Sequence, residues 1–226
     1  MIYFEKLTKI YPDQTVALKD VSFSINKGEF VSIVGHSGAG KTTLLRMLLA
    51  EDTPTSGKVS VESVDVHKLR KNQIHKYRRK FGTVFQDFKL LPTKTAFENI
   101  AFAMEVAGRL DEEIARDVPD ALELVGLSNK AWRFPRELSG GEKQRIAIAR
   151  ALVNQPEVII ADEPTGNLDP INTMEIVEIL KKINELGTTV ILTTHNRGVT
   201  DSIKKRVITM EGGKVARDDK DGKYVL

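Results

Sequence analysis

The sequence predicts an α/β fold: a core of buried strands and helices, a small antiparallel β region before it, and a helical subdomain within it. Continuous apolar runs rich in β-branched residues are typical of strands buried on both faces, and three of them predict the core, at 30–34, 158–161 and 189–194. Two segments suggest the β region, 2–7 and the cleanly alternating 21–25. Apolar residues at helical spacing predict the subdomain, from about 95 to 153.

We expect residues 1–226 to form a single domain with three parts. The parts are a β region at about 1–30, a core at about 31–86 and 154–226, and a helical subdomain at about 87–153. Pro119 lies inside a predicted helix, which we expect it to kink or split. Two short strands near the C-terminus, joined by Gly212 and Gly213, are expected to form a hairpin.

Composition limits the classes of function. The chain is 41% hydrophobic and 29% charged, which is ordinary for a soluble protein with a proper core. Its net charge of +3 is too small to argue for nucleic acid, and we expect no nucleic-acid partner. The absence of cysteine excludes a disulfide framework and thiolate metal sites, in agreement with a reducing cytosol. No apolar run is long enough to cross a membrane, and we expect no signal peptide, but docking onto a membrane protein stays open.

A glycine-rich loop between a predicted strand and a predicted helix is the most specific feature of the sequence. It fits the phosphate-binding pattern G-x-x-x-x-G-K-[ST]. Glycines let backbone N–H groups point at phosphate oxygens, and the N-terminus of the following helix adds positive potential. Lys41 is expected to reach the β- and γ-phosphates, and the Thr42 hydroxyl to ligate Mg²⁺. The predicted phosphate-binding loop consists of Gly35, His36, Ser37, Gly38, Ala39, Gly40, Lys41, Thr42 and Thr43.

Polar residues follow the other predicted core strands, and ligands of open α/β sheets bind at such strand ends. We expect Asp162 to hold Mg²⁺ and Glu163 to polarise the water that attacks the γ-phosphate. Gln86, at the end of a further short buried strand predicted at 81–85, is a candidate for contacting Mg²⁺ or that water. His195 is a candidate partner of the γ-phosphate, although a lone histidine is usually structural. The candidate catalytic residues are Lys41, Gln86, Glu163 and His195, and the candidate magnesium ligands are Thr42, Gln86 and Asp162.

A second loop of small residues, 138–142, opens another predicted helix. By the same argument it is a second anion site, with the Ser139 hydroxyl and backbone N–H groups as donors. The alternative is a simple helix cap at Ser139. A third turn, which contains Asp169, leads into a helix at 171–186.

Three segments allow two interpretations each. Tyr11 is suited to stacking on an adenine or to holding the β region together. The basic run from His67 to Lys80 is typical of a solvated helix face, and the alternative is a surface for anionic lipid headgroups. The loop 87–92 has three large apolar residues, Phe88, Leu90 and Leu91. They either pack into the helical subdomain or form part of a groove for a helix of a membrane protein.

The order of these motifs along the whole chain resembles the ABC ATPase nucleotide-binding domain. The resemblance implies a P-loop ATPase core, ATP and Mg²⁺ as ligands, and two domains that face head to tail and trap two ATP molecules. It implies adenine stacking for Tyr11 and a switch role for His195. Because one chain has one phosphate loop, two complete sites require a second chain, most simply in an ATP-dependent homodimer. The opposite subunit would contribute Ser139, Gly140, Gly141, Glu142 and Asp169.

Several segments are similar to the bacterial cell-division branch of that family. They are 35–41, Arg78 and Arg79 with 81–82, 85–87, 90–91, 134–135 and 161–169. This resemblance implies a peripheral protein on the cytoplasmic face of the plasma membrane, an integral membrane partner, and a relay of ATP hydrolysis to cell-wall hydrolases. The form Gly166-Asn167-Leu168-Asp169 is shared with lipoprotein-release and macrolide-export ATPases, so transport is the alternative. A clamp on DNA or ribosomes is disfavoured because the chain has no coiled-coil insertion or second cassette.

Overall fold

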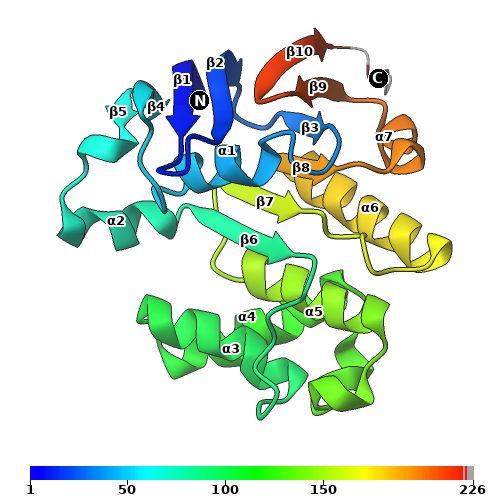
Figure 1. Ribbon diagram of the computed structural model, residues 1–226. Coiled ribbons are helices and arrows are strands. Elements are labelled where there is room, and N and C mark those ends of the chain that lie inside the picture. The colour runs from blue at the N-terminus through cyan, green and yellow to red at the C-terminus, as the bar shows by residue number, and fades with distance from the viewer. Residues whose placement is uncertain (221, 223–226) are drawn as a thin grey trace.

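The computed structural model describes residues 1–220 and 222, and the rest of the expected core, 221 and 223–226, lies outside the described part. A six-stranded sheet forms the centre of the molecule, with the strand order β10-β9-β3-β8-β7-β6 (Figure 1). All neighbours pair in parallel except the edge strand β10, which forms the expected C-terminal hairpin with β9. The strands are β3 (Phe30–Val34), β6 (Phe81–Phe85), β7 (Val158–Asp162), β8 (Thr189–Thr194), β9 (Arg206–Glu211) and β10 (Lys214–Asp219).

The register of the parallel strands brings their carboxyl ends to one edge of the sheet. Val34 at the end of β3 is paired with Thr194 at the end of β8, and Phe85 at the end of β6 with Asp162 at the end of β7. The residues that follow these four strands therefore emerge at one edge, the place where open α/β sheets bind their ligands.

A second, antiparallel sheet has the order β2-β1-β4-β5. Its strands are β1 (Ile2–Ile10), β2 (Val16–Ile25), β4 (Ser56–Val61) and β5 (Val64–Asp65). Residues 56–65 thus join the N-terminal strands, although they lie in the range expected for the core. They do so because β4 pairs with β1 although the paired residues are 48 to 59 positions apart in the sequence, and this pairing buries Val59 and Val61 beside Phe4.

The helices divide between the flanks of the central sheet and a separate group, α3 to α5, at the far end of the molecule from the antiparallel sheet (Figure 1). Pro119 is exposed, and α4 continues through it without a split, because Val118 and Leu122 anchor the helix in the core on both sides. The α-helices are α1 (Lys41–Leu48), α2 (Lys71–Arg78), α3 (Ala96–Ala107), α4 (Asp111–Leu124), α5 (Gly140–Leu152), α6 (Pro170–Glu185) and α7 (Arg197–Ile203). Three short 3₁₀ helices are η1 (Val66–Lys68), η2 (Ser128–Lys130) and η3 (Pro135–Glu137).

The core consists of two apolar clusters, one on each face of the six-stranded sheet. Alternate residues of β7 supply both: Val158 and Ile160 pack with α1 and the antiparallel sheet, whereas Ile159 and Ala161 pack with the helices of the other face. This two-sided burial explains the continuous apolar runs of the sequence. It also holds the ends of the core strands rigidly, which positions the side chains of the candidate site.

Candidate functional site

The glycine-rich loop joins β3 to α1 and depends on glycine at defined positions. Gly35 and Gly40 have φ values of 152° and 99°, which residues with a side chain rarely adopt. A Cβ atom would also lie 2.3 Å from the Met210 carbonyl oxygen at Gly35, and 2.5 Å from the Ala17 carbonyl oxygen at Gly40. The loop is therefore held closely between the start of β2 and the end of β9.

Lys41, the first residue of α1, is buried and turns its amine back toward the loop. Its Nζ donates to the carbonyl oxygens of Gly35 at 2.7 Å and His36 at 3.2 Å. It also forms an ion pair with Glu163 Oε1 at 3.3 Å, and the Lys41 side chain is only 7% exposed. A buried charge needs such a partner, and a phosphate group would compete with Glu163 for this amine.

Asp162 is held between two hydroxyl groups at the end of β7. Thr42 Oγ1 donates to Asp162 Oδ2 at 3.2 Å, and Thr193 Oγ1 donates to Asp162 Oδ1 at 2.5 Å. Thr193 is fully buried, and its hydroxyl and carbonyl oxygens also accept the backbone N–H of Glu163, each at 3.1 Å. Thr193 thus fixes both acidic residues, and sequence reasoning missed it.

The Glu163 carboxylate joins Lys41 to His195. Its Oε2 lies 3.0 Å from His195 Nδ1, while Oε1 faces Lys41. Glu163 has a φ of 49°, an uncommon conformation for a residue with a side chain, and such conformations cluster at functional sites. The structure therefore brings three of the four candidate catalytic residues into one row, Lys41, Glu163 and His195.

The neighbouring oxygens of Thr42 and Asp162 fit a magnesium ion. Mg²⁺ prefers hard oxygen ligands and usually takes only one or two carboxylates, with the rest of its shell from water and substrate phosphates. Within residues 1–220 and 222, no three His, Cys, Asp or Glu side chains gather as a metal site of their own. A magnesium ion held by these two oxygens would take the rest of its shell from water and phosphate oxygens.

Gln86 has a different partner from the one expected. Its Nε2 donates to Asn167 Oδ1 at 3.1 Å, and Asn167 Nδ2 donates to the Gln86 carbonyl oxygen at 3.4 Å. Gly166 leaves room for this pair, since a Cβ there would lie 2.8 Å from Gln86 Nε2. The Gln86 side chain thus bonds to the turn after Glu163, and its contact with Mg²⁺ or water stays a prediction.

The second loop of small residues caps α5. Ser139 Oγ accepts the N–H of Glu142 at 3.2 Å, and Glu142 Oε2 accepts the N–H of Ser139 at 2.8 Å, which together form a capping box. That backbone N–H of Ser139 is the main cause of a lowered pKa for Glu142, and Lys130 adds to the effect. The structure thus bears out the capping alternative. The anion site stays a prediction, because the Ser139 hydroxyl can still donate.

The capped end of α5 adjoins the start of α6. A Cβ at Gly141 would lie 1.8 Å from Asn172 Oδ1, so the Asn172 side chain would have to move to admit any larger residue. Asp169 caps α6, with its Oδ1 accepting the N–H groups of Ile171 and Asn172 at 3.0 Å each. These N–H groups help to lower the pKa of Asp169, the bond from Asn172 most of all. The residues predicted to serve an opposite subunit therefore lie close together, and all of them except the buried Gly141 are at least partly exposed.

Tyr11 lies at the turn after β1 and is half-buried. Lys9 Nζ lies 5.0 Å from the centre of the Tyr11 ring. The backbone N–H of Tyr11 donates to the Thr15 carbonyl oxygen at 2.9 Å. These contacts favour a role in holding the turn, and adenine stacking stays a prediction.

Comparison with known proteins identifies the family. The model of the ABC transporter family matches residues 18–166. The cell division ATP-binding protein FtsE of Mycobacterium tuberculosis is 51% identical over 99% of this chain and 98% of its own length, and FtsE of Bacillus subtilis is 48% identical over the same shares. The chain therefore belongs to the ABC transporter family, and it is an ATP-hydrolysing enzyme of the cell-division type. The resemblance predicted from the motifs is confirmed.

Solved structures agree with this assignment. A dimeric bacterial ABC transporter cassette matches with a TM-score of 0.89 and 39% identity, over 99% of this chain and 100% of that one. A dimeric cassette in a post-hydrolysis state, bound to ADP and Pi, matches with a TM-score of 0.88 and 38% identity, over the same shares. The expected α/β ATPase fold is confirmed. In the part of the chain described here, no helix has the length and apolar character to span a membrane.

Proposed function

We propose that this protein is the ATP-hydrolysing subunit of a cell-division complex on the cytoplasmic face of the plasma membrane. In this proposal it pairs with an integral membrane protein similar to FtsX and relays ATP binding and hydrolysis to cell-wall hydrolases. The observation that carries the proposal is the match to FtsE proteins over nearly the full length of both chains. Methionine import ATP-binding proteins, by contrast, are 42–45% identical, and the match covers only 60–66% of their length.

The partner can be tested by co-expression. We expect the chain to be retained in membranes when it is expressed with the FtsX-like protein of the same genome, and to remain in the soluble fraction when it is expressed with a lipoprotein-release permease. Retention is measured by sedimentation of membranes and quantitative blotting. Retention by the permease alone would support the transport alternative instead.

The geometry of the site supports a proposed role for each side chain. Lys41 and the N–H groups of its loop would bind the phosphates of ATP, and Glu163 would accept a proton from the attacking water. His195, 3.0 Å from Glu163, would orient that carboxylate. Thr42 and Asp162 would hold Mg²⁺, which supplies positive charge beside the phosphates when it is bound.

A homodimer would complete the site. The loop 139–142, which is partly exposed except at the buried Gly141, lies close to the exposed Asp169 and outside the row formed by Lys41, Glu163 and His195. The related cassettes were solved as dimers. In a head-to-tail pair with two-fold symmetry, each chain would present this surface to the ATP bound by the other.

Ser139→Arg is expected to leave ATP binding by the monomer within about twofold of wild type and to lower ATP turnover by at least about tenfold, because a large side chain would fill the gap for the opposite γ-phosphate. Binding is measured by calorimetry and turnover by phosphate release. Arg136→Ala, an exposed change just before the loop, is the control and should retain wild-type turnover. Full turnover by Ser139→Arg would contradict the head-to-tail arrangement.

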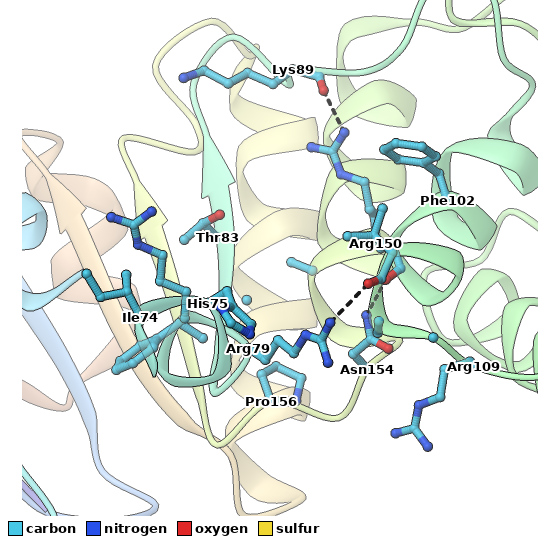
Figure 2. Close-up of a pocket in the computed structure, with 18 of the residues that line it drawn as sticks. Ile74, His75, Arg79, Thr83, Lys89, Phe102, Arg109, Arg150, Asn154 and Pro156 are labelled. Carbon is cyan, nitrogen blue, oxygen red and sulfur yellow. Dashed lines mark hydrogen bonds between the residues drawn. The ribbon is translucent and has the colours of Figure 1, made fainter. Parts of the chain in front are cut away.

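A groove of about 1210 Å³ between α2 and α3 is our proposed docking place for the membrane partner (Figure 2). Its lining is partly apolar and includes Leu91, whereas Leu90 packs into the core. Among the described residues that line the groove, one ion pair occurs, between Arg109 and Glu113. The other lysines and arginines of the lining have no carboxylate partner in the described chain. They are Lys71, Arg78, Arg79, Lys89 and Arg150. We therefore propose that the occupant is a short amphipathic segment with an acidic face.

Charge reversal on α2 tests this groove. Lys71 lines it and Lys76, on the same helix, does not, although both side chains are exposed. Lys71→Glu is expected to weaken membrane retention by the FtsX-like partner by about tenfold and to leave ATP binding unchanged, because it turns an attractive contact into a repulsive one. Lys76→Glu should retain wild-type behaviour. Equal losses in both variants would point instead to a general attraction to anionic lipid.

A further inference from the structure

The short segment that contains Gln86 is held by α5 on both of its sides. Before Gln86, Gln144 Nε2 donates to the Phe85 carbonyl oxygen at 3.2 Å. After it, Arg150 donates to the carbonyl oxygens of Phe88 at 2.9 Å and Lys89 at 2.6 Å, and Figure 2 shows the bond to Lys89. Two side chains of one helix thus hold the segment 85–89 at both ends.

Gln144 is fully buried, although it lies on a helix whose other buried residues are apolar or glycine. Its Nε2 also donates to the Pro164 carbonyl oxygen at 2.8 Å, one residue beyond Glu163. Its Oε1 is buried with no hydrogen-bond partner in the described chain, and a buried amide is costly unless it is bonded, so its presence here indicates a constraint on position rather than on packing. Gln144 therefore connects α5 both to the Gln86 segment and to the segment that follows Glu163.

The far side of the segment has an uncommon backbone. Phe88 and Lys89 are consecutive residues with side chains and have φ values of 59° and 47°. Such conformations persist when their surroundings determine them. Arg150 supplies this constraint with a charged, half-buried group whose pKa is lowered by its burial.

The same helix begins with the small-residue loop. Its first residue is Gly140, and a Cβ built there would lie 4.0 Å from Phe88 Cζ, so the Phe88 ring is close to that loop. Because α5 is a continuous helix of 13 residues, a shift of its first turn is transmitted to Gln144 and Arg150.

We propose that Gln144 and Arg150 are positioning residues that lock the Gln86 segment to α5. Gln86 in one ATP site then moves together with the Ser139–Gly141 loop that α5 presents to the other site. This inference rests on the proposed head-to-tail dimer. It assigns a role in communication between the two sites to residues outside both of them.

A matched pair of arginines on α5 tests the proposal. Arg145 is also half-buried, but it pairs with Glu175 of α6 and makes no bond to the Gln86 segment. Arg150→Met is expected to lower kcat by about tenfold with KM for ATP within about twofold of wild type, because it misplaces a catalytic group without touching the nucleotide. Arg145→Met should keep kcat within about twofold, even if both variants melt at lower temperature. Equal kcat values for these two variants would overturn the proposal.

A double-mutant cycle separates positioning from general damage. Gln86→Ala alone is expected to lower kcat by about tenfold, and adding Arg150→Met should lower it by no more than a further twofold, because Arg150 acts through Gln86. If the two single losses in kcat multiply in the double variant, the proposal that Arg150 acts through Gln86 is overturned. Gln144→Met is tested in the same cycle if Arg150→Met does not fold. A Glu163→Gln protein that stays monomeric on gel filtration with ATP would overturn the dimer, and with it the link between sites, so the two failures are distinguishable.

Discussion

Glu163→Gln is expected to lower kcat for ATP hydrolysis by at least about a hundredfold while ATP binding persists, because a general base typically contributes 10²- to 10⁴-fold and the amide cannot accept a proton. The amide keeps the shape of the side chain. It also removes the negative charge that lies 3.3 Å from Lys41, which leaves that amine more available to phosphate. ATP affinity should therefore be equal to that of wild type or higher, and without hydrolysis the ATP-bound dimer should persist.

Three measurements check this result: phosphate release, calorimetry with ATP, and gel filtration with and without ATP. The matched control is Glu157→Gln, at the opposite end of β7, where Glu157 is exposed and pairs with Lys80. The control should hydrolyse ATP at the wild-type rate and show no stable dimer. Wild-type turnover by Glu163→Gln would exclude Glu163 as the base.

The strand ends of the site could be predicted from the sequence because they depend on local patterns. The runs 30–34 and 189–194 coincide with β3 and β8, and continuous apolar runs require burial on both faces. Parallel pairing then brings the residues after the strands to one edge. The meeting of Glu163 with His195 follows from this register, since β7 and β8 are neighbours in the sheet.

The partners within the site could not be predicted, because they depend on non-local side-chain bonds. Thr193 holds Asp162, and Asn167 pairs with Gln86, yet a threonine in a strand and an asparagine in a turn are both ordinary. The signal for Gln144 was a polar residue among the apolar positions of its helix. The pairing of β4 with β1 was likewise hidden, because strand register over a long sequence separation leaves no local pattern.

The pairing of Lys41 with Glu163 was also not predicted, since the sequence assigned one residue to phosphate and the other to water. It means that a single buried amine supports two features of the site. Nζ holds the loop through the carbonyl oxygens of Gly35 and His36, and it balances the charge of the proposed base. A change at Lys41 should therefore affect loop structure and acid–base chemistry as well as binding.

Lys41→Ala is accordingly expected to weaken ATP binding by at least about thirtyfold, since loss of a buried charged partner typically costs about 2–5 kcal/mol. It should also lower the melting temperature of the free protein, because Glu163 loses its cation and two carbonyl oxygens lose their donor. Calorimetry with ATP and thermal melting measure the two effects.

Lys41→Met keeps most of the aliphatic stem, so it should recover part of the stability and none of the affinity. Arg46→Ala removes an exposed cation from the same helix and should change neither quantity. Unchanged ATP affinity in both Lys41 variants would show that this loop is not where the phosphates bind.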